Sequence, residues 1–365
     1  MKKILNIIDT SGPGGAETVF INLCSAQRKA GLTPIAVIKG PGYVQDQLVH
    51  NEIKTIILPS KGSFNFSLLR NLVRIIYKEN IDLIQSHLFG SAVYASLAGL
   101  ICSKPVVSTI HGKVDINKED RLAILKTLIV RYGCNRIISV SEQIRSFLNT
   151  VPFLPTTKIE LIYNGVDASL YSRNNHPEIR KRLGLGNDLV IGSLGNIRTP
   201  KNYSLAIDTL KNLHESGVKA HYLIAGEGKG KLLSELKSAI HEAGLDKYVH
   251  LLGFVENVQD FLSSLDIFLI SSSSEGHPLA LTQAMINGIP IVSTTCGVED
   301  ILEHDQEAIL TKENTAEYLS NGIQQLISTP SKAASLANAA KTKALSHYSL
   351  DAMTDKYLSL YESLY

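Results

Sequence analysis

The chain has 365 residues, of which 44% are hydrophobic and 19% are charged. That length favours two domains rather than one, and the composition excludes a disordered or fibrous protein. The four cysteines, Cys24, Cys102, Cys134 and Cys296, form no C-x-x-C pair. They therefore indicate neither a zinc cluster nor a disulfide framework, and a reducing, cytoplasmic setting is expected.

The net charge of +2 is unevenly distributed along the chain. Up to Gly165 there are 19 Lys and Arg residues against 11 Asp and Glu, and beyond it 17 against 23. A basic first half favours an anionic partner such as a phospholipid surface or a phosphorylated substrate, although ordinary scatter of solvated charge explains it equally well. No segment reaches the roughly 20 apolar residues of a membrane-spanning helix, and residues 88–102 are expected to form a close-packed internal helix.

Short runs rich in Ile and Val alternate with stretches of helical periodicity, which is the pattern of parallel strands covered by crossover helices. The pattern predicts two doubly wound α/β units. The strands expected in the first are Ile4–Asp9, Pro34–Ile38, Thr55–Leu58, Asp82–His87, Pro105–His111, Arg136–Ser141 and Lys158–Tyr163. Those expected in the second are Leu189–Leu194, His221–Ala225, Val249–Leu252, Ile267–Ser271 and Pro290–Thr294.

The segment between the two units is punctuated by Asn-Gly, Asn-Asn and His-Pro, so a hinge is expected there. The predicted domains are residues 1–165, a linker over 166–187, a second domain over 188–346, and a final helix over 347–365. That helix carries Met353, Tyr357, Leu360 and Tyr361 at helical spacing, which predicts one apolar face.

Ligands of open parallel sheets bind beyond the carboxyl ends of the strands, and unusual residues follow several of these ends. After the first strand comes a glycine-rich turn, Ser11–Glu17, which allows an anion to approach the next helix. Glu17 occupies the place of the third glycine of a dinucleotide motif, so a nicotinamide site is disfavoured, while a turn needed only for packing remains open. For His111, which ends the fifth strand, a sugar contact and a purely structural role are equally supported. For His87 the structural role is favoured.

In the second half, Arg198 and Lys201 follow Gly195 and Asn196 and open a helix. Two cations at a strand end beside a helix N-terminus are suited to neutralising a diphosphate, although a solvated basic turn is the alternative. A second glycine-rich turn, residues 226–230, strengthens the expectation of a nucleotide.

The most distinctive segment runs from Ser271 to Met285, where an apolar strand leads into serines, Glu275, Gly276 and Pro278. Glu275 is expected just outside a helix N-terminus and Gln283 about two turns inside the helix. Both side chains can bond vicinal hydroxyls of a sugar or ribose. Gln283 cannot act as an acid or nucleophile, so a hydrolytic carboxylate dyad is disfavoured.

Together these residues resemble the retaining, nucleotide-sugar-dependent glycosyltransferases of family 4, which have the GT-B fold of two Rossmann-like domains. The resemblance covers essentially the whole chain. It depends on Gly14–Glu17, Ser139–Ser141, Asn164–Asp167, the region of Arg198 and Lys201, Gly226–Gly228, Glu275–Leu279 and the closing Tyr-rich helix.

The resemblance implies sugar transfer from a nucleoside diphosphate sugar, with retention and without a bound metal or tightly bound cofactor. The donor is UDP-linked or GDP-linked, and of the two a UDP-sugar is favoured. The first domain would hold a glycan or lipid-linked acceptor for a bacterial surface polysaccharide, and the last helix would cross back onto it. The catalytic residues implied are His111, Glu275, Arg198 and Lys201. The donor contacts implied are Gly15, Gly195, Asn196, Arg198, Lys201, Gly226, Phe254, Glu275, Gly276, His277, Pro278, Leu279 and Gln283.

Two departures from the family pattern stand out. Asn196 occupies the arginine position of G-R-x4-K, with Arg198 displaced by two positions, and Gln283 replaces the second Glu of E-x7-E. The amide in place of a carboxylate predicts altered donor affinity or choice, or loss of activity.

Two other functions remain open: a sugar-nucleotide epimerase of the same fold, and a catalytically idle sugar-nucleotide or glycan-binding module. The expected setting is cytoplasmic, at the inner membrane face if the basic first domain binds lipid. The expected protein is a monomer or homodimer that binds no nucleic acid.

Overall fold

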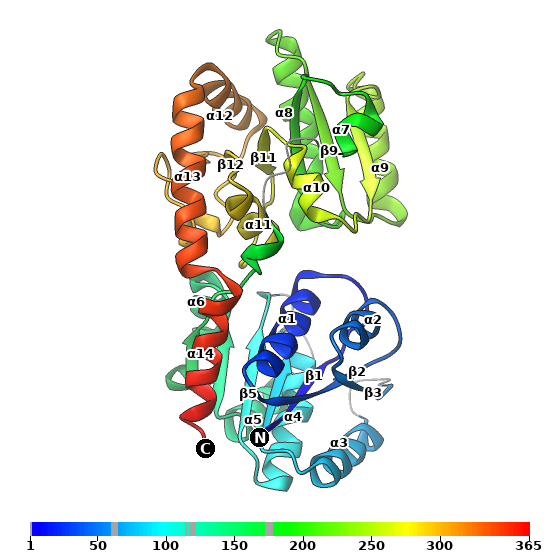
Figure 1. Cartoon of the computed structure of the whole chain (residues 1–365), viewed down its shortest axis with the longest axis vertical. Helices are drawn as coiled ribbons and strands as arrows, with labels where there is room; N and C mark the ends of the chain where they lie inside the picture. Colours follow the sequence, from blue (N-terminus) through cyan, green and yellow to red (C-terminus); the bar gives the residue numbers. More distant parts are fainter. Residues whose placement is uncertain (1, 60–64, 114–115, 117–121, 172–177) are drawn as a thin grey trace. The chain divides into compact units, whose positions relative to one another are not determined.

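The computed structural model describes residues 2–59, 65–113, 116, 122–171 and 178–365. The chain forms two compact units, each built on one parallel sheet: the first comprises residues 1–165 and 350–365, and the second residues 166–349 (Figure 1). This is the predicted α/β class, two doubly wound sheets. The described residues of 166–187, expected as a linker, belong to the second unit, where Asp260 accepts backbone N–H groups from Glu178 and Ile179 at 2.8 and 3.1 Å.

The sheet of the first unit has seven parallel strands in the order β3-β2-β1-β4-β5-β6-β7. The strands are β1 (Lys3–Ile8), β2 (Thr33–Ile38), β3 (Lys54–Ile57), β4 (Leu83–His87), β5 (Val106–Ile110), β6 (Arg136–Ser139) and β7 (Ile159–Leu161). The helices are α1 (Gly15–Lys29), α2 (Tyr43–His50), α3 (Phe66–Glu79), α4 (Phe89–Cys102), α5 (Ala123–Gly133), α6 (Glu142–Asn149) and α14 (Leu350–Glu362), with a 3₁₀ turn over Thr156–Lys158.

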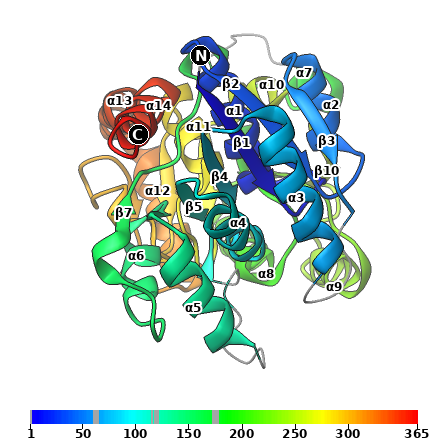
Figure 2. The same cartoon turned by 90° about the horizontal axis from the view of Figure 1, so that it is seen from below.

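The helices of the first unit cover its sheet on both faces. Helices α3, α4, α5 and α6 contribute to one apolar core, in which α4 lies between α3 and α5 (Figure 2). Helices α1 and α2 build a second core against β1 and β2. The four cysteines of the chain are buried as free thiols.

The second unit has a six-stranded parallel sheet in the order β10-β9-β8-β11-β12-β13. Its strands are β8 (Leu189–Leu194), β9 (Ala220–Ala225), β10 (Val249–Gly253), β11 (Ile267–Ile270), β12 (Ile291–Ser293) and β13 (Ile309–Leu310). Its helices are α7 (Glu178–Leu183), α8 (Tyr203–Glu215), α9 (Gly230–Glu242), α10 (Val258–Ser263), α11 (Leu279–Asn287), α12 (Ala316–Ser328) and α13 (Pro330–His347), with 3₁₀ turns over Ala168–Leu170, Thr199–Lys201 and Val298–Asp300.

All twelve strands expected from the sequence are present, with ends within two residues of those predicted. Strand β13 was not predicted, because two residues show no periodicity that distinguishes a strand from a loop. None of the helices in the described parts of the chain is both long enough and apolar enough to cross a membrane.

The strand orders define where ligands bind. In the first sheet the order reverses between β1 and β4, and in the second between β8 and β11. At such a point the loops that leave the two neighbouring strands turn to opposite faces, which opens a crevice at the carboxyl end of the sheet.

The predicted apolar face of the last helix is confirmed, because Met353, Tyr357, Leu360 and Tyr361 of α14 are all buried in the first unit. Helix α14 packs against α1 (Figure 1). Helix α14 also forms a buried hydrogen bond with the sheet: the hydroxyl of Tyr357 lies 2.8 Å from Oγ1 of Thr109 on β5.

Replacing Tyr361 by phenylalanine is expected to destabilise the first unit by about 2 kcal/mol. The Tyr361 hydroxyl donates to Gln85 Oε1 at 2.9 Å and accepts from Gln27 Nε2 at 3.2 Å, so its removal leaves a buried amide oxygen without this donor. Denaturant unfolding measures the loss. The matched control is Tyr365→Phe, an exposed tyrosine near the end of the same segment, which should change stability by less than about 0.5 kcal/mol. Equal effects of the two variants would contradict this role for the buried hydroxyl.

Candidate active site

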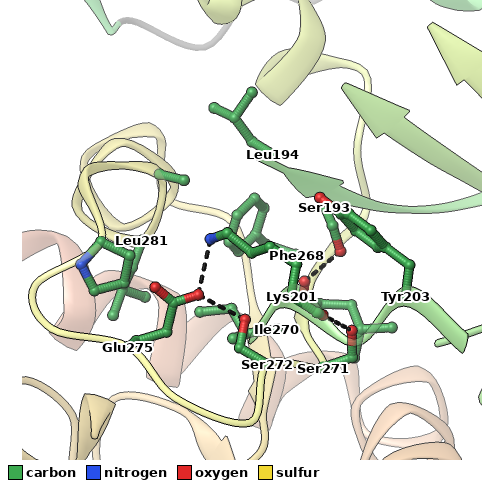
Figure 3. Close-up of a pocket in the computed structure, with 13 residues that line it drawn as sticks. Ser193, Leu194, Lys201, Tyr203, Phe268, Ile270, Ser271, Ser272, Glu275 and Leu281 are labelled. Atoms are coloured by element: carbon green, nitrogen blue, oxygen red, sulfur yellow. Dashed lines mark hydrogen bonds and ion pairs between the residues drawn. The ribbon is translucent and has the colours of Figure 1, made fainter. Parts of the chain in front are cut away.

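The loops that leave β8 and β11 meet at the strand-order reversal of the second unit. β8 and β11 are hydrogen-bonded neighbours, and the loop after each leads into a helix, α8 and α11 respectively. A small pocket lies where the loops meet (Figure 3). The residues lining it include Ser193, Lys201, Tyr203, Ser271, Ser272, Glu275 and Pro278.

Lys201 and Glu275 form an ion pair in this pocket, with Nζ 2.8 Å from Oε1. The same carboxylate oxygen accepts the Ser272 hydroxyl at 2.6 Å, and Figure 3 shows the lysine and the serine converging on it. The side chains are 25% and 12% exposed, so both charges are partly removed from water while they retain access to the pocket. When a ligand binds, such a pair can separate: the cation can bind a phosphate group and the carboxylate can accept hydrogen bonds from hydroxyl groups.

Backbone contacts hold the Lys201 loop in place. The Ser271 hydroxyl donates to the Lys201 carbonyl at 3.0 Å, and the Tyr203 hydroxyl donates to the Gly195 carbonyl at 2.6 Å. Burial is the largest cause that raises the pKa of Tyr203, with the nearby Tyr222 and Glu275 adding to it. Tyr203 therefore stays a neutral hydrogen-bond donor at physiological pH.

The glycine turns after β8 and β9 pack directly against each other. Asn196 Oδ1 accepts the Glu227 N–H at 2.9 Å, and the Ile197 N–H donates to the Glu227 carbonyl at 2.7 Å. A Cβ added to Gly226 would lie 2.1 Å from the Gly195 carbonyl oxygen, so only glycine fits there. The two turns predicted to lie near a nucleotide are thus one connected structure.

The expected helix N-terminus after Glu275 is confirmed: Pro278 is the N-cap of α11, and Leu279 is its first residue. In this first turn the Leu281 N–H donates to the Pro278 carbonyl at 3.0 Å. The two N–H groups before it, those of Leu279 and Ala280, precede the first intrahelical hydrogen bonds and can receive an anion. The His277 ring is buried, with Nε2 3.0 Å from Thr282 Oγ1, and it makes a T-shaped contact with the Tyr348 ring. Burial lowers the pKa of His277 to about 3, so the ring is neutral.

Gln283 lies within α11, 9% exposed, and its Nε2 donates to the Tyr171 hydroxyl at 2.7 Å. The amide oxygen carries two lone pairs of its own, which makes it the group that can accept a ligand hydroxyl. Tyr171 thus holds Gln283, one of the two departures from the family pattern, in place.

Two of the predicted donor contacts differ from this cluster in their surroundings. The side chain of Arg198 is exposed and makes no hydrogen bond or ion pair with any residue in the described ranges. Phe254 follows β10 and is 47% exposed. The structure therefore brings Lys201, Glu275 and Gln283 into packed surroundings and leaves Arg198 and Phe254 at the surface.

Gly15 and His111 belong to the first unit. Gly15 begins α1, with Gly14 as its N-cap, and a Cβ there would meet nothing within 4 Å. His111 follows β5, and its Nε2 lies 2.9 Å from Nδ1 of the fully buried His87. Burial lowers the pKa of His111 to about 3, so the imidazole is neutral.

The first unit also contains a cavity of about 230 Å³ between the carboxyl ends of β1 and β2 and the helices α3 and α4. Its polar lining residues are Asp9, at the end of β1, together with Lys39, Ser91, Tyr94 and Lys126, and the rest of the wall is largely apolar. Burial is the largest cause that raises the pKa of the Asp9 carboxyl, and the charge of Lys39 opposes it.

Sequence reasoning missed several of these residues. Asp9 was predicted only as the last residue of the first strand, and Ser272, Tyr171 and Tyr203 were not distinguished from their neighbours. Strand-end position was a usable signal for Asp9. Tyr171 had none, because it contacts Gln283 across 112 residues of chain.

Among the described residues, no group of three or more His, Cys, Asp and Glu side chains is placed to hold a metal ion.

Two family models match the chain. The one described as Glycosyl transferases group 1 matches residues 175–343, and the one described as Glycosyltransferase Family 4 matches residues 13–170. The two matches divide the chain close to the boundary between its two units.

Three known proteins illustrate the similarity. The chain is 24% identical over 303 residues to the UDP-Gal:alpha-D-GlcNAc-diphosphoundecaprenol alpha-1,3-galactosyltransferase of Escherichia coli, covering 79% of this chain and 78% of that protein. It is 28% identical over 197 residues to the O-antigen biosynthesis glycosyltransferase WclY of Escherichia coli, covering 52% and 53%. The Anabaena protein HepE, solved in complex with UDP and glucose, has a TM-score of 0.90 at 21% identity, covering 100% of both chains.

Proposed function

Because the chain belongs to the family 4 glycosyltransferases and has their GT-B fold, we propose that it transfers a sugar from a UDP-linked donor, with retention at the anomeric carbon and without a bound metal ion. The acceptor is a glycan or a lipid-linked glycan of a bacterial surface polysaccharide. The observation that carries the donor site is the Lys201–Glu275 pair at the strand-order reversal of the second unit.

In this proposal the second unit holds the donor by charge and hydrogen bonding. Lys201 and the N-terminal N–H groups of α11 balance the negative charge of the diphosphate. That charge increases as the bond between the sugar and the diphosphate breaks. Glu275 exchanges its bond to Lys201 for hydroxyls of the donor sugar. Arg198 is exposed and therefore available to add a second cation when donor binds.

The first unit holds the acceptor. Its cavity combines an apolar wall with a carboxyl group, Asp9, and two cations, Lys39 and Lys126. Such a lining suits a molecule with apolar carbon, hydroxyls and a phosphate, which a lipid-linked glycan supplies. The galactosyltransferase of Escherichia coli, whose name specifies a diphosphoundecaprenol acceptor, supports this assignment. The Lys and Arg excess up to Gly165 supports peripheral attachment of the protein to an anionic membrane surface.

The function is tested by calorimetric binding of nucleoside diphosphates, then of their sugar conjugates, and finally by nuclear magnetic resonance of the reaction with acceptor. We expect UDP to bind most tightly and the product to keep the anomeric configuration of the donor. Isomerised donor would instead establish an epimerase, and binding without any reaction would establish an idle binding module. Activity that disappears with a chelator and returns only with magnesium or manganese would overturn metal independence.

Replacing Gln283 by glutamate is expected to tighten donor binding by about 5-fold, or ~1 kcal/mol. The carboxylate accepts hydroxyl hydrogens more strongly than the amide oxygen does, and the Tyr171 hydroxyl can turn to donate to it. Calorimetric Kd values for UDP and the donor measure the change, with Gln325→Glu on α12 as the control. Equal Kd values for wild type and Gln283→Glu would show that this side chain does not contact the nucleotide.

A further inference from the structure

Two histidines of the first unit stack on each other at the carboxyl end of its sheet. His87 is the last residue of β4, and His111 follows the neighbouring strand β5. Their ring centroids lie 5.2 Å apart with the planes 18° from parallel, and His87 Nδ1 lies 2.9 Å from His111 Nε2. One of these nitrogens must carry the shared proton and the other must accept it.

The surroundings of His87 decide which nitrogen carries it. His87 is 0% exposed, and its second nitrogen, Nε2, is buried without a hydrogen-bond partner in the part of the chain that the structure describes. Phe20 packs against the ring in a T-shaped arrangement, with the centroids 5.3 Å apart. A buried N–H without an acceptor forfeits a full hydrogen bond, so Nε2 is better left unprotonated.

The proton of neutral His87 then resides on Nδ1 and is donated to His111 Nε2. Because His111 Nε2 accepts that bond, the neutral His111 ring carries its own proton on Nδ1. Burial lowers the pKa of both rings, so neither becomes an imidazolium at neutral pH.

The backbone beside His87 is strained in a way that holds the ring in place. Leu88, the next residue, has φ 71° and ψ 152°, a conformation that is almost confined to glycine. Its N–H bonds the Thr109 carbonyl at 3.0 Å, which ties the end of β4 to β5. Strain of about 1–3 kcal/mol persists only where the surroundings enforce it, and such positions cluster at functional sites.

We propose that His87 is a positioning residue that fixes the tautomer of His111, so that His111 presents Nδ1–H as a hydrogen-bond donor to the transferred sugar. The inference depends on the proposed function, because His111 touches substrate only if the protein is a glycosyltransferase that uses this residue. A fixed donor binds a sugar oxygen without first exchanging its proton between the two nitrogens, which is the general benefit of an oriented imidazole.

The tautomer is tested directly on the full chain labelled with ¹⁵N-histidine, by long-range proton–nitrogen correlation, with His111 assigned from a His111→Gln sample. We expect His111 to show a protonated Nδ1 and an unprotonated Nε2. In His87→Leu, which removes the donor, His111 should shift toward the Nε2-protonated form. In His87→Asn the amide nitrogen takes the place of Nδ1, so the wild-type tautomer should return. A His111 ring protonated on Nε2 in wild type, or unchanged in His87→Leu, would overturn the proposal.

Kinetics supply the second readout. His87→Leu should lower kcat on the order of 10-fold with little change in the donor KM, because the groups proposed to balance the diphosphate, Lys201 and the first turn of α11, belong to the second unit. His87→Asn should restore most of the loss. Thermal unfolding of both variants separates this effect from a folding defect. An equal loss of kcat in His87→Leu and His87→Asn would assign His87 a packing role only and would contradict the inference. If wild type forms no glycosidic bond, the proposed function fails, yet the resonance experiment still decides the tautomer.

Discussion

Replacing Lys201 by methionine is expected to lower kcat/KM for sugar transfer on the order of 100-fold. The lysine supplies a partly buried cation, at 25% exposure, in the pocket between the loops after β8 and β11. The departing diphosphate gains charge in the transition state, so loss of a preorganised cation slows the chemical step more than it weakens binding. Methionine keeps most of the volume of the side chain but removes the charge and the N–H donors, including the bond to Glu275. Initial rates over a range of donor concentrations separate kcat from KM.

The matched control for this experiment is Lys211→Met. Lys211 lies on α8, ten residues further along the chain, is 51% exposed and pairs only loosely with Glu215 at 3.9 Å. Its loss should leave kcat/KM within about 2-fold, because an exposed ion pair is worth little. Thermal unfolding of Lys201→Met tests whether the unpaired Glu275 destabilises the fold. A folded Lys201→Met protein with wild-type turnover would exclude Lys201 from the donor site.

Replacing Gly226 by alanine is expected to destabilise the second unit by about 3 kcal/mol and to lower its unfolding midpoint by roughly 10 °C. The new Cβ would lie 2.1 Å from the Gly195 carbonyl oxygen and 2.4 Å from the Gly195 carbonyl carbon, and Gly226 has φ 154°. Both neighbours are backbone atoms, so no rotation of a side chain relieves the clash. The two glycine turns must separate, and the Lys201 loop moves with them.

Gly230→Ala separates the clash from the backbone conformation. Gly230 has φ 64°, but a Cβ there would meet nothing within 4 Å, so alanine should cost only about 1 kcal/mol of conformational strain. Calorimetry of the two variants gives the difference. Similar unfolding midpoints for Gly226→Ala and Gly230→Ala would show that the close approach of the two turns does not require glycine at position 226.

The fold could be predicted from the sequence because parallel sheets leave a strong local signal. The run of apolar residues in β8 and the spacing of Met353 and Tyr357 in α14 are each readable within a short window. The position of the final helix on the first unit was implied by family resemblance, since nothing local in α14 specifies its partner.

The candidate site was only partly predictable. Strand-end position identified Lys201 and Glu275 separately, and no sequence signal showed that they would pair across 74 residues. The same is true of two other contacts, Tyr171 with Gln283 and His87 with His111. Each forms because the fold makes neighbours of segments that are far apart in the sequence. The packing of His277 against Tyr348 also left no signal in the sequence, and the donor contact implied for this residue stays a prediction.

The first unit is made from two stretches of chain with the whole second unit between them. A nascent chain leaving the ribosome therefore completes all seven strands of the first sheet long before α14 exists. During that interval the surface around Gln27 and Gln85, which Tyr361 later covers, faces solvent. The amino-terminal unit is thus the first to begin folding and the last to finish. It reaches its full stability only when the final helix has packed onto it.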